Sequence, residues 1–234
     1  LSLHDALPIS AGAARVSAAL SQRRRIGLTV AAILLFITVV LASFVHRVSQ
    51  PRLMSAGELK ANGLYLMDPP RSLGDFALTD HRGDPFTPAA LRGRWSLLFF
   101  GFTHCPDVCP TTMAFLDRFV AALEGTEAED TQVVMISVDP ARDTVAQLAT
   151  YVPFFNPEFT GVTGEFLDLF RLATNLNTPF RKVPGQGENY QVDHSANVVL
   201  INPRGDYHGF FKAPLELAKM KVTYRAAREL WERS

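Results

Sequence analysis

The only two cysteines of the chain, Cys105 and Cys109, lie four positions apart in the stretch Gly101-Phe-Thr-His-Cys-Pro-Asp-Val-Cys-Pro110. Three residues separate them, one more than in the common Cys-x-x-Cys redox motif. Two sulfurs spaced in this way can close a disulfide or converge on one soft metal ion, and the sequence leaves both uses open. The flanking proline and aspartate make a purely structural role as small buried residues the weaker interpretation.

The elements on either side place both sulfurs at the junction of a strand and a helix. Residues 95–100 form an apolar run that is typical of a strand buried on both faces, and Gly101 interrupts it. After Pro110, apolar residues recur at helical spacing at Met113, Leu116, Val120 and Leu123. Cys109 is therefore predicted at a helix N-terminus, with Cys105 in the preceding loop, as in thioredoxin. Because backbone N–H groups there favour an anion, we expect a lowered thiol pKa.

A third soft-metal ligand would come from one of the chain's six histidines. His194 is the best candidate, because it follows the long polar loop 177–192 and precedes the predicted strand 196–201. Asp193 could orient its ring or tune it as a ligand. On the residues alone, a structural or surface role for a single histidine remains open. The other five are expected to be solvated or turned away from the cysteines: His4, His46, His81, His104 and His208.

Asp139 is a candidate supporting residue, because it follows the predicted strand 132–138. In α/β folds the carboxyl ends of strands carry the functional groups. A turn or cap role is equally compatible with this position. Asp143 is predicted to cap a helix that carries Val145, Leu148 and Val152 and is stopped by Pro153.

The remaining patterns predict a mixed α/β sheet covered by helices. They indicate a β-hairpin over 74–87, a helix over 165–175 with Phe166, Leu169, Phe170 and Ala173 inward, a strand over 206–211, and a closing helix over 214–231. The closing helix would bury one face, formed by Leu215, Ala218, Val222, Ala226 and Leu230.

Residues 26–45 contain no charged side chain and would span about 30 Å as a helix, which is the thickness of a bilayer core. Three arginines, Arg23 to Arg25, directly precede this segment, so the positive-inside rule places the N-terminus in the cytoplasm. A cleaved signal peptide is the competing interpretation, but the apolar run is longer than is usual for one. We therefore expect four parts: a cytoplasmic leader (1–25), a transmembrane anchor (26–45), a tether (46–72) and a globular domain (73–234).

Charge and cysteine content exclude some classes of function for the globular part. Acidic side chains outnumber basic ones over 51–234, which argues against nucleic acid as a partner. With two cysteines, an exported domain has no disulfide framework, so its stability must come from its core.

Three motifs resemble the signatures of the Sco/SenC family, a group of anchored copper-binding proteins of thioredoxin-like fold. They are Phe100-Gly-Phe-Thr-His-Cys-Pro-Asp-Val-Cys-Pro-Thr-Thr-Met113, Ser137-Val-Asp-Pro-Ala-Arg-Asp-Thr144 and Val192-Asp-His-Ser195. The similarity covers roughly residues 72–232 and includes a single N-terminal span. A lone Cys-x-x-x-Cys would be weak, but three motifs in this order are specific.

This resemblance implies that Cys105, Cys109 and His194 bind one copper ion, with Asp139 in the family's acidic position near the site. The protein would act as a metallochaperone, without turnover, that delivers copper to the dinuclear copper centre of cytochrome c oxidase. Its partners would be the copper-bearing oxidase subunit and other periplasmic copper chaperones or thiol reductases. The implied location is the inner membrane, with the globular domain in the periplasm.

Two other functions remain open from the sequence. A thiol–disulfide oxidoreductase would cycle Cys105 and Cys109 to keep the cysteines of the oxidase copper site reduced, without needing His194 as a ligand. A peroxidase-like enzyme on the same fold is a weaker alternative, because no clear peroxide-binding constellation surrounds the thiol.

Overall fold

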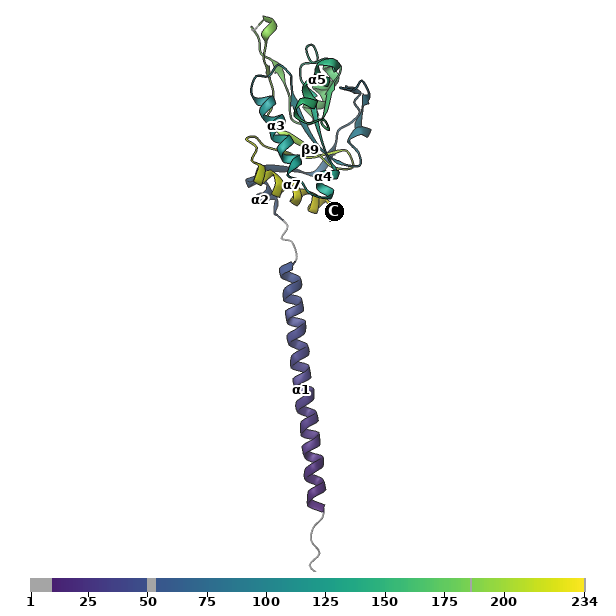
Figure 1. Ribbon diagram of the computed structural model, residues 1–234, viewed down its shortest axis with the longest axis vertical. Helices are drawn as coiled ribbons and strands as arrows, with labels where there is room; N and C mark the ends of the chain where they lie inside the picture. Colours follow the sequence, from purple (N-terminus) through teal and green to yellow (C-terminus); the bar gives the residue numbers. More distant parts are fainter. Residues whose placement is uncertain (1–9, 50–53, 186, 234) are drawn as a thin grey trace, which may run out of the picture. The chain divides into compact units, whose positions relative to one another are not determined.

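The computed structural model describes residues 10–49, 54–185 and 187–233, and the chain divides into two units, residues 1–52 and 53–234 (Figure 1). The first unit contains one helix, α1 (Ser10–Ser49). Within it, residues 23–47 are long and apolar enough to cross a membrane. Their large apolar side chains are exposed, so the hydrocarbon of a bilayer would cover them. The predicted span 26–45 is confirmed as a candidate membrane helix, and the helix begins earlier, within the leader. Residues 1–9 of the leader lie outside the described residues.

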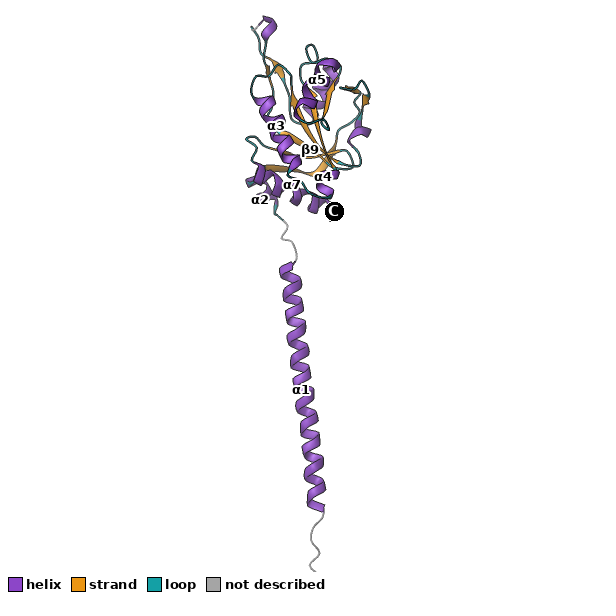
Figure 2. Ribbon diagram, in the orientation of Figure 1, coloured by secondary structure: helices purple, strands orange, loops and turns teal. Residues whose placement is uncertain are grey.

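The second unit is the globular domain, in which the strands form a central sheet with helices packed against it (Figure 2). Its α-helices are α2 (Ala56–Ala61), α3 (Val108–Ala121), α4 (Thr126–Glu129), α5 (Val145–Phe155), α6 (Phe166–Asn175) and α7 (Leu217–Glu232), with 3-10 turns η1 (Pro88–Leu91) and η2 (Gly187–Asn189). Its strands are β1 (Leu64–Ser72), β2 (Leu78–Asp80), β3 (Pro85–Phe86), β4 (Trp95–Gly101), β5 (Thr131–Ser137), β6 (Thr160–Thr163), β7 (Arg181–Lys182), β8 (Val192–Asp193), β9 (Val198–Ile201) and β10 (Asp206–Phe211).

The main sheet has the strand order β1-β10-β9-β4-β5-β6-β2-β3. Strands β4, β5 and β6 are parallel, and the other pairings are antiparallel. All seven residues of β4 are buried, as the apolar run predicted. The mixed α/β fold is confirmed, and so is the predicted hairpin, in which Leu78 of β2 pairs with Phe86 of β3.

Helix α3 contacts both α5 and α7, and in Figure 1 it lies between them. It buries Met113, Leu116 and Phe119 against the sheet core, so the predicted apolar spacing gives its inward face. Each fully buried side chain of this size stabilises the fold by about 1.5–3 kcal/mol relative to its exposed state. The helix that starts at the cysteine pair is therefore anchored along its length.

The prediction of a tether over 46–72 is wrong for residues 46–49, which belong to α1, and for residues 56–61 and 64–72, which form α2 and β1. Ser55 and Glu58 make a capping box that starts α2. Strand β1 is an edge strand of the main sheet, and its pairing with β10 is interrupted between Leu66 and Arg71. Pro69 and Pro70 lie in this interruption, where missing N–H donors break no ladder. Residues 50–53 of the predicted tether lie outside the described residues.

Several predicted helix details are also wrong. The N-cap of α5 is Thr144 instead of Asp143, and the helix continues through Pro153 to Phe155. Phe166 and Phe170 of α6 are 53% and 39% exposed, so they do not face inward. The inward residues of α7 are Met220, Thr223, Tyr224, Ala226, Ala227 and Arg228, whereas Val222 is 55% exposed.

Part of the predicted long loop 177–192 is ordered as a small hairpin. Strand β7 pairs antiparallel with β8, with Arg181 opposite Asp193 and Lys182 opposite Val192. This hairpin is a separate two-stranded sheet. It leads directly into His194, so it positions that residue.

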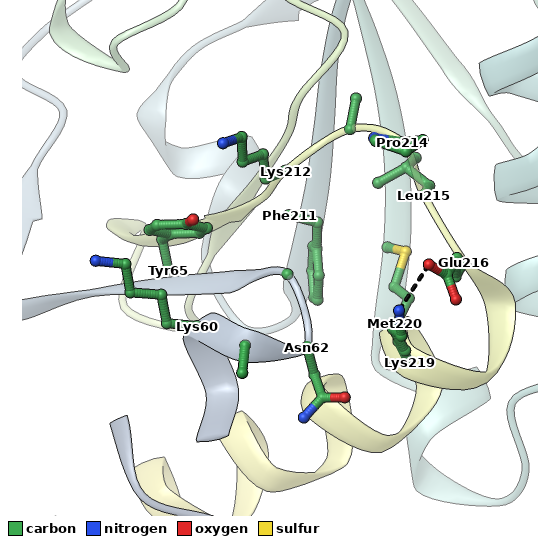
Figure 3. A pocket seen from close by; sticks show the side chains of 13 residues that line it. Lys60, Asn62, Tyr65, Phe211, Lys212, Pro214, Leu215, Glu216, Lys219 and Met220 are labelled. Atoms are coloured by element: carbon green, nitrogen blue, oxygen red, sulfur yellow. Dashed lines mark hydrogen bonds and ion pairs between the residues drawn. The ribbon is translucent and has the colours of Figure 1, made fainter. Parts of the chain in front are cut away.

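A hollow of about 260 Å³ lies between α2, the end of β10 and the start of α7 (Figure 3). Lys60 and Lys212 approach the ring of Tyr65, with ammonium-to-centroid distances of 5.6 and 6.0 Å, and Lys219 pairs with Glu216 at 2.7 Å. None of the candidate site residues lines this hollow. The chemistry of the cysteine pair is therefore carried by a different part of the domain.

Candidate metal centre

Cys105 and Cys109 lie at the start of α3, as their sequence context predicts. Cys109 is in the first turn of the helix, and its backbone N–H donates to Cys105 Sγ at 3.4 Å. Cys109 is fully buried and Cys105 is partly exposed, and neither is in a disulfide. Both sulfurs are therefore available to bind one metal ion.

His194 lies beside the two cysteines, although it is 85 residues after Cys109 in the sequence. Its Nε2 lies 3.5 Å from Cys109 Sγ, and the three ligand atoms of Cys105, Cys109 and His194 all lie within 4.8 Å of one another. The His194 ring packs edge-on against Phe99 and Phe102, with centroid distances of 6.1 and 5.7 Å. Among the described residues, this is the one group of three metal-ligating side chains that the structure brings together.

The hydrogen bonding of His194 leaves its Nε2 atom available to bind a metal ion. Its Nδ1 lies 3.0 Å from the carbonyl oxygen of Ser195, which can only accept, so Nδ1 carries the proton. Nε2 then keeps its lone pair and faces the sulfurs. Burial lowers the pKa of His194, although the Ser195 carbonyl and the Asp193 charge oppose this effect. The imidazole is therefore neutral at neutral pH, which is the ligating form.

The expected lowering of the thiol pKa is wrong for Cys109. Burial raises its pKa, and the neighbouring Cys105 and Asp143 add to this effect. Desolvation of a thiolate in a dry site thus outweighs the favourable backbone N–H groups. A metal ion at this position must displace the proton of Cys109, so binding releases protons.

Gly101 makes room for the Cys109 sulfur at the end of β4. A Cβ at this position would lie 3.0 Å from Cys109 Sγ and 2.7 Å from the ring of Phe99. Beside the sulfurs, a hollow of about 290 Å³ is lined in part by Cys105, Val108 and His194. The centre thus has a closed side at Gly101 and an open side next to Cys105.

Asp139 and Asp193 do not reach the ligand atoms. The carboxylate of Asp139 is buried and accepts a hydrogen bond from Tyr190 Oη at 2.6 Å and another from Arg142 Nε. Asp193 is exposed and pairs with Arg181 at 3.3 Å instead of orienting the His194 ring. The charge of Asp193 still affects the pKa of His194, whereas Asp139 contacts Tyr190 and Arg142 and no ligand atom.

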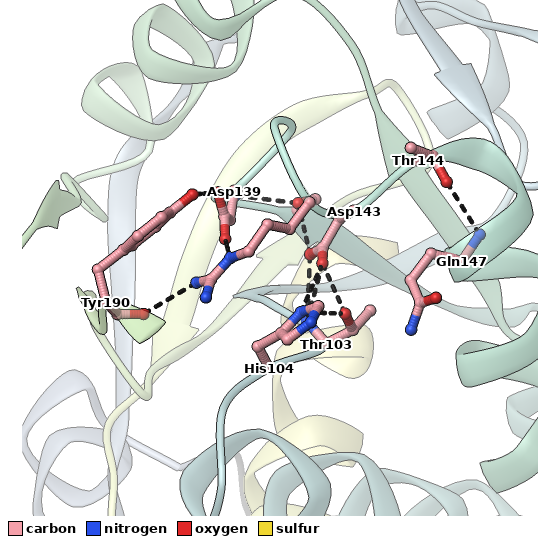
Figure 4. A network of polar contacts seen from close by, with 9 residues as sticks. Thr103, His104, Asp139, Asp143, Thr144, Gln147 and Tyr190 are labelled. Carbon is pink, nitrogen blue, oxygen red and sulfur yellow. Dashed lines mark hydrogen bonds and ion pairs between the residues drawn. The ribbon is translucent and has the colours of Figure 1, made fainter. Parts of the chain in front are cut away.

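Asp143 proves to be part of the support of the cysteine loop (Figure 4). Its fully buried carboxylate accepts from the N–H and hydroxyl of Thr103 and from the Ser137 hydroxyl, the hydroxyls at 2.6 and 2.8 Å. Burial raises the pKa of Asp143, which the three donors partly offset. Thr103 is two residues before Cys105, so Asp143 fixes the entry to the loop. The sequence predicts a helix cap at Asp143, whereas its carboxylate instead accepts hydrogen bonds from Thr103 and Ser137.

Two of the histidines expected to be solvated are buried. His81 is 8% exposed and its Nδ1 accepts from the N–H of Gly161 at 3.0 Å. His208 is 7% exposed and packs edge-on against Trp95 and Trp231. His104 does turn away from the sulfurs, as expected, and its Nδ1 lies 3.1 Å from Thr103 Oγ1. His4 lies outside the described residues, and His46 is exposed on α1.

Residues 67–227 match the family model described as SCO1/SenC. The chain belongs to the SCO1/SenC family. It is 41% identical over 154 residues to a putative copper-binding protein of Stutzerimonas stutzeri, which covers 66% of this chain and 76% of that protein. It is 42% identical over 144 residues to the mouse mitochondrial SCO2 homolog, covering 58% of this chain and 55% of the mouse protein.

Solved SCO1/SenC structures share the fold. The crystal structure of Arabidopsis thaliana ScoI with copper bound superimposes with a TM-score of 0.61 at 32% identity, over 68% of this chain and 98% of that chain. Bradyrhizobium japonicum ScoI with copper bound gives a TM-score of 0.57 at 33% identity, over 68% and 97% of the two chains. The domain is therefore thioredoxin-like, and copper is the cofactor that these relatives support.

The donor set of this SCO1/SenC chain fits copper. Thiolates suit soft Cu(I), and imidazole suits copper in either oxidation state. The neutral Nε2 of His194 and the two free sulfurs lie close enough for one small ion to contact all three. The open side next to Cys105 supplies an entry path.

Proposed function

We propose that this protein is a membrane-anchored copper metallochaperone that delivers copper to the dinuclear copper centre of cytochrome c oxidase. Cys105, Cys109 and His194 would hold the ion. The observation that carries this proposal is the approach of three ligand atoms to within 4.8 Å from segments that are remote in sequence. The copper-bound ScoI relatives support the same assignment.

The burial of the three side chains suits a site that releases its metal. Cys109 is closed off, whereas Cys105 and His194 are partly exposed. A ligand from an acceptor protein can therefore approach on the open side and replace them one at a time. The acceptor in this proposal is the copper-bearing subunit of the oxidase, and other periplasmic copper chaperones or thiol reductases would act before it.

The test is copper stoichiometry and affinity of the full chain in detergent, measured under reducing conditions and again after oxidation. We expect one tightly bound copper that is lost when Cys105 and Cys109 form a disulfide. His194→Ala should weaken binding by more than tenfold, because it removes one of three ligands. His104→Ala is the matched control, since that ring is adjacent to Cys105 but faces Thr103. Unchanged affinity of His194→Ala would remove this residue from the site.

The second candidate function is a thiol–disulfide oxidoreductase that keeps the oxidase cysteines reduced. It is favoured by the partial exposure of Cys105 with Cys109 beside it, because an accessible sulfur can react with a disulfide of another protein. If the reduced protein retains no copper but has a reversible Cys105–Cys109 disulfide, the oxidoreductase becomes the better assignment.

The proposed location is the inner membrane, with the N-terminus in the cytoplasm and the globular domain in the periplasm. The support is the three arginines that precede the apolar part of α1. Protease treatment of spheroplasts tests this orientation: the globular domain should be digested while the cells remain intact. A protected domain would reverse the topology.

A further inference from the structure

We propose that Tyr190, Asp139 and Arg142 form a clamp that positions His194 as a copper ligand. The clamp joins the loop after β5 to the β7–β8 hairpin, which carries His194 at its end. This inference rests on the proposed copper site. The three residues contact neither sulfur, so they are positioning residues.

The β7–β8 hairpin has little of its own to hold it in place. Each strand is two residues long, and one further backbone bond joins the Val183 N–H to the Gln191 carbonyl at 2.8 Å. Its ion pair between Arg181 and Asp193 is 81% and 60% exposed, and exposed pairs contribute about 0–1 kcal/mol. The position of this hairpin relative to the cysteines must therefore be set by contacts with the rest of the domain.

The clamp supplies such contacts on both the side chain and the backbone of Tyr190 (Figure 4). Tyr190 Oη donates to Asp139 Oδ1 at 2.6 Å, and Arg142 Nη2 donates to the Tyr190 carbonyl at 3.0 Å. Arg142 Nε donates to the other oxygen of Asp139, which closes the set. Tyr190 and Asp139 are 9% and 4% exposed, and hydrogen bonds to a buried carboxylate are among the strong ones.

Two cations also hold the ring of Tyr190. The Arg142 guanidinium carbon lies 3.7 Å from the ring centroid, and Lys182 Nζ lies 3.4 Å from it. Lys182 belongs to β7 and Arg142 to the loop after β5, so the ring links the hairpin to the domain a second time. Loss of the hydroxyl alone would leave these contacts intact.

The same short loop fixes both halves of the metal centre. Asp139 and Arg142 hold the hairpin that carries His194, and Asp143 holds Thr103 at the entry to the cysteine loop. His194 itself contacts Cys109, the Ser195 carbonyl and the edges of two aromatic rings. Residues 139–143 therefore contact both the segment that carries the imidazole and the segment that carries the sulfurs.

The experiment uses Tyr190→Phe in the full chain in detergent, a change that removes one hydroxyl. Without copper, we expect faster backbone hydrogen exchange in peptides covering residues 181–193. Copper(I) affinity should fall about tenfold, which is the usual effect of losing a partner behind a metal ligand. Tyr65→Phe is the matched control, because Tyr65 lines the hollow of Figure 3, which none of the candidate site residues lines. It should change neither measurement.

A double variant separates positioning from a general loss of structure. If the clamp acts through His194, Tyr190→Phe should have no further effect on copper affinity in a His194→Ala background. Equal effects of Tyr190→Phe in both backgrounds, or unchanged exchange over 181–193, would overturn the proposal. If the unmodified protein binds no copper, the proposed function fails, while the exchange measurement still decides whether the clamp exists.

Discussion

His208 should make the stability of the domain depend on pH between 7 and 5. Its ring packs edge-on against Trp95 and Trp231, with centroid distances of 5.1 and 5.6 Å, and among the described residues neither ring nitrogen has a hydrogen-bond partner. Burial lowers the pKa of His208 from 6.5 to about 4, with Arg204 adding to this effect and Asp206 opposing it. The folded protein therefore strongly prefers the neutral imidazole.

The sign and size of the effect follow from these two pKa values. Between pH 6.5 and 4 the unfolded chain binds the proton and the folded chain does not, so stability is lost as the pH falls through this range. The full difference is about 3 kcal/mol, and about 2 kcal/mol of it is lost between pH 7 and pH 5. Conversely, raising the pH above 7 should add almost nothing through this group.

The assay is urea unfolding of the full chain in detergent at pH 7 and pH 5, followed by tryptophan fluorescence. Both tryptophans of the chain lie in the globular unit, so the signal reports that unit alone. His208→Phe keeps an aromatic ring but cannot be protonated, so it should lose about 2 kcal/mol less than the unmodified protein over the same pH change. If both proteins lose the same free energy of unfolding, the reasoning about His208 is refuted.

Two further substitutions test the support of the cysteines. Gly101→Ala should displace the Cys109 sulfur, because the new Cβ would lie 3.0 Å from it. Copper affinity should fall, and the free energy of unfolding should fall by about 1–3 kcal/mol. A copper affinity, measured by calorimetry, that equals that of the unmodified protein would contradict this. Asp143→Ala removes the acceptor of the buried Ser137 hydroxyl and of the N–H and hydroxyl of the half-buried Thr103. An unsatisfied buried donor costs about 1–3 kcal/mol, so urea unfolding should show a loss of about 2 kcal/mol or more, and a smaller loss for Asp143→Asn. Equal losses in the two variants would show that the hydrogen bonds are not the cause.

The fold and the cysteine pair were predictable because they depend on local signals. The apolar run of β4, the helical spacing after Pro110 and the position of Cys109 are all encoded within about twenty residues. The membrane helix is encoded in the same way by its lack of charge. His194 was predicted from its place between a loop and a strand, and the structure brings it to the sulfurs.

The errors came where long-range contacts override a local signal. Pro69 and Pro70 indicated a tether, but an edge strand with a break in its pairing accommodates them. Asp143 and Thr144 are both good helix caps, and only the fold shows that Thr103 needs the first as an acceptor. The role of Tyr190 was missed because its partner Asp139 is remote in sequence.

The unequal burial of the two thiols assigns them different roles toward electrophiles. Cys105 is partly exposed, whereas Cys109 is fully buried and has a raised pKa. An alkylating reagent or the disulfide of another protein therefore meets Cys105 first, and any mixed disulfide forms at that sulfur. If the protein is the oxidoreductase of the second candidate function, Cys105 would be the attacking cysteine, and Cys109, four residues further along the chain, would resolve the mixed disulfide and release the other protein's thiol.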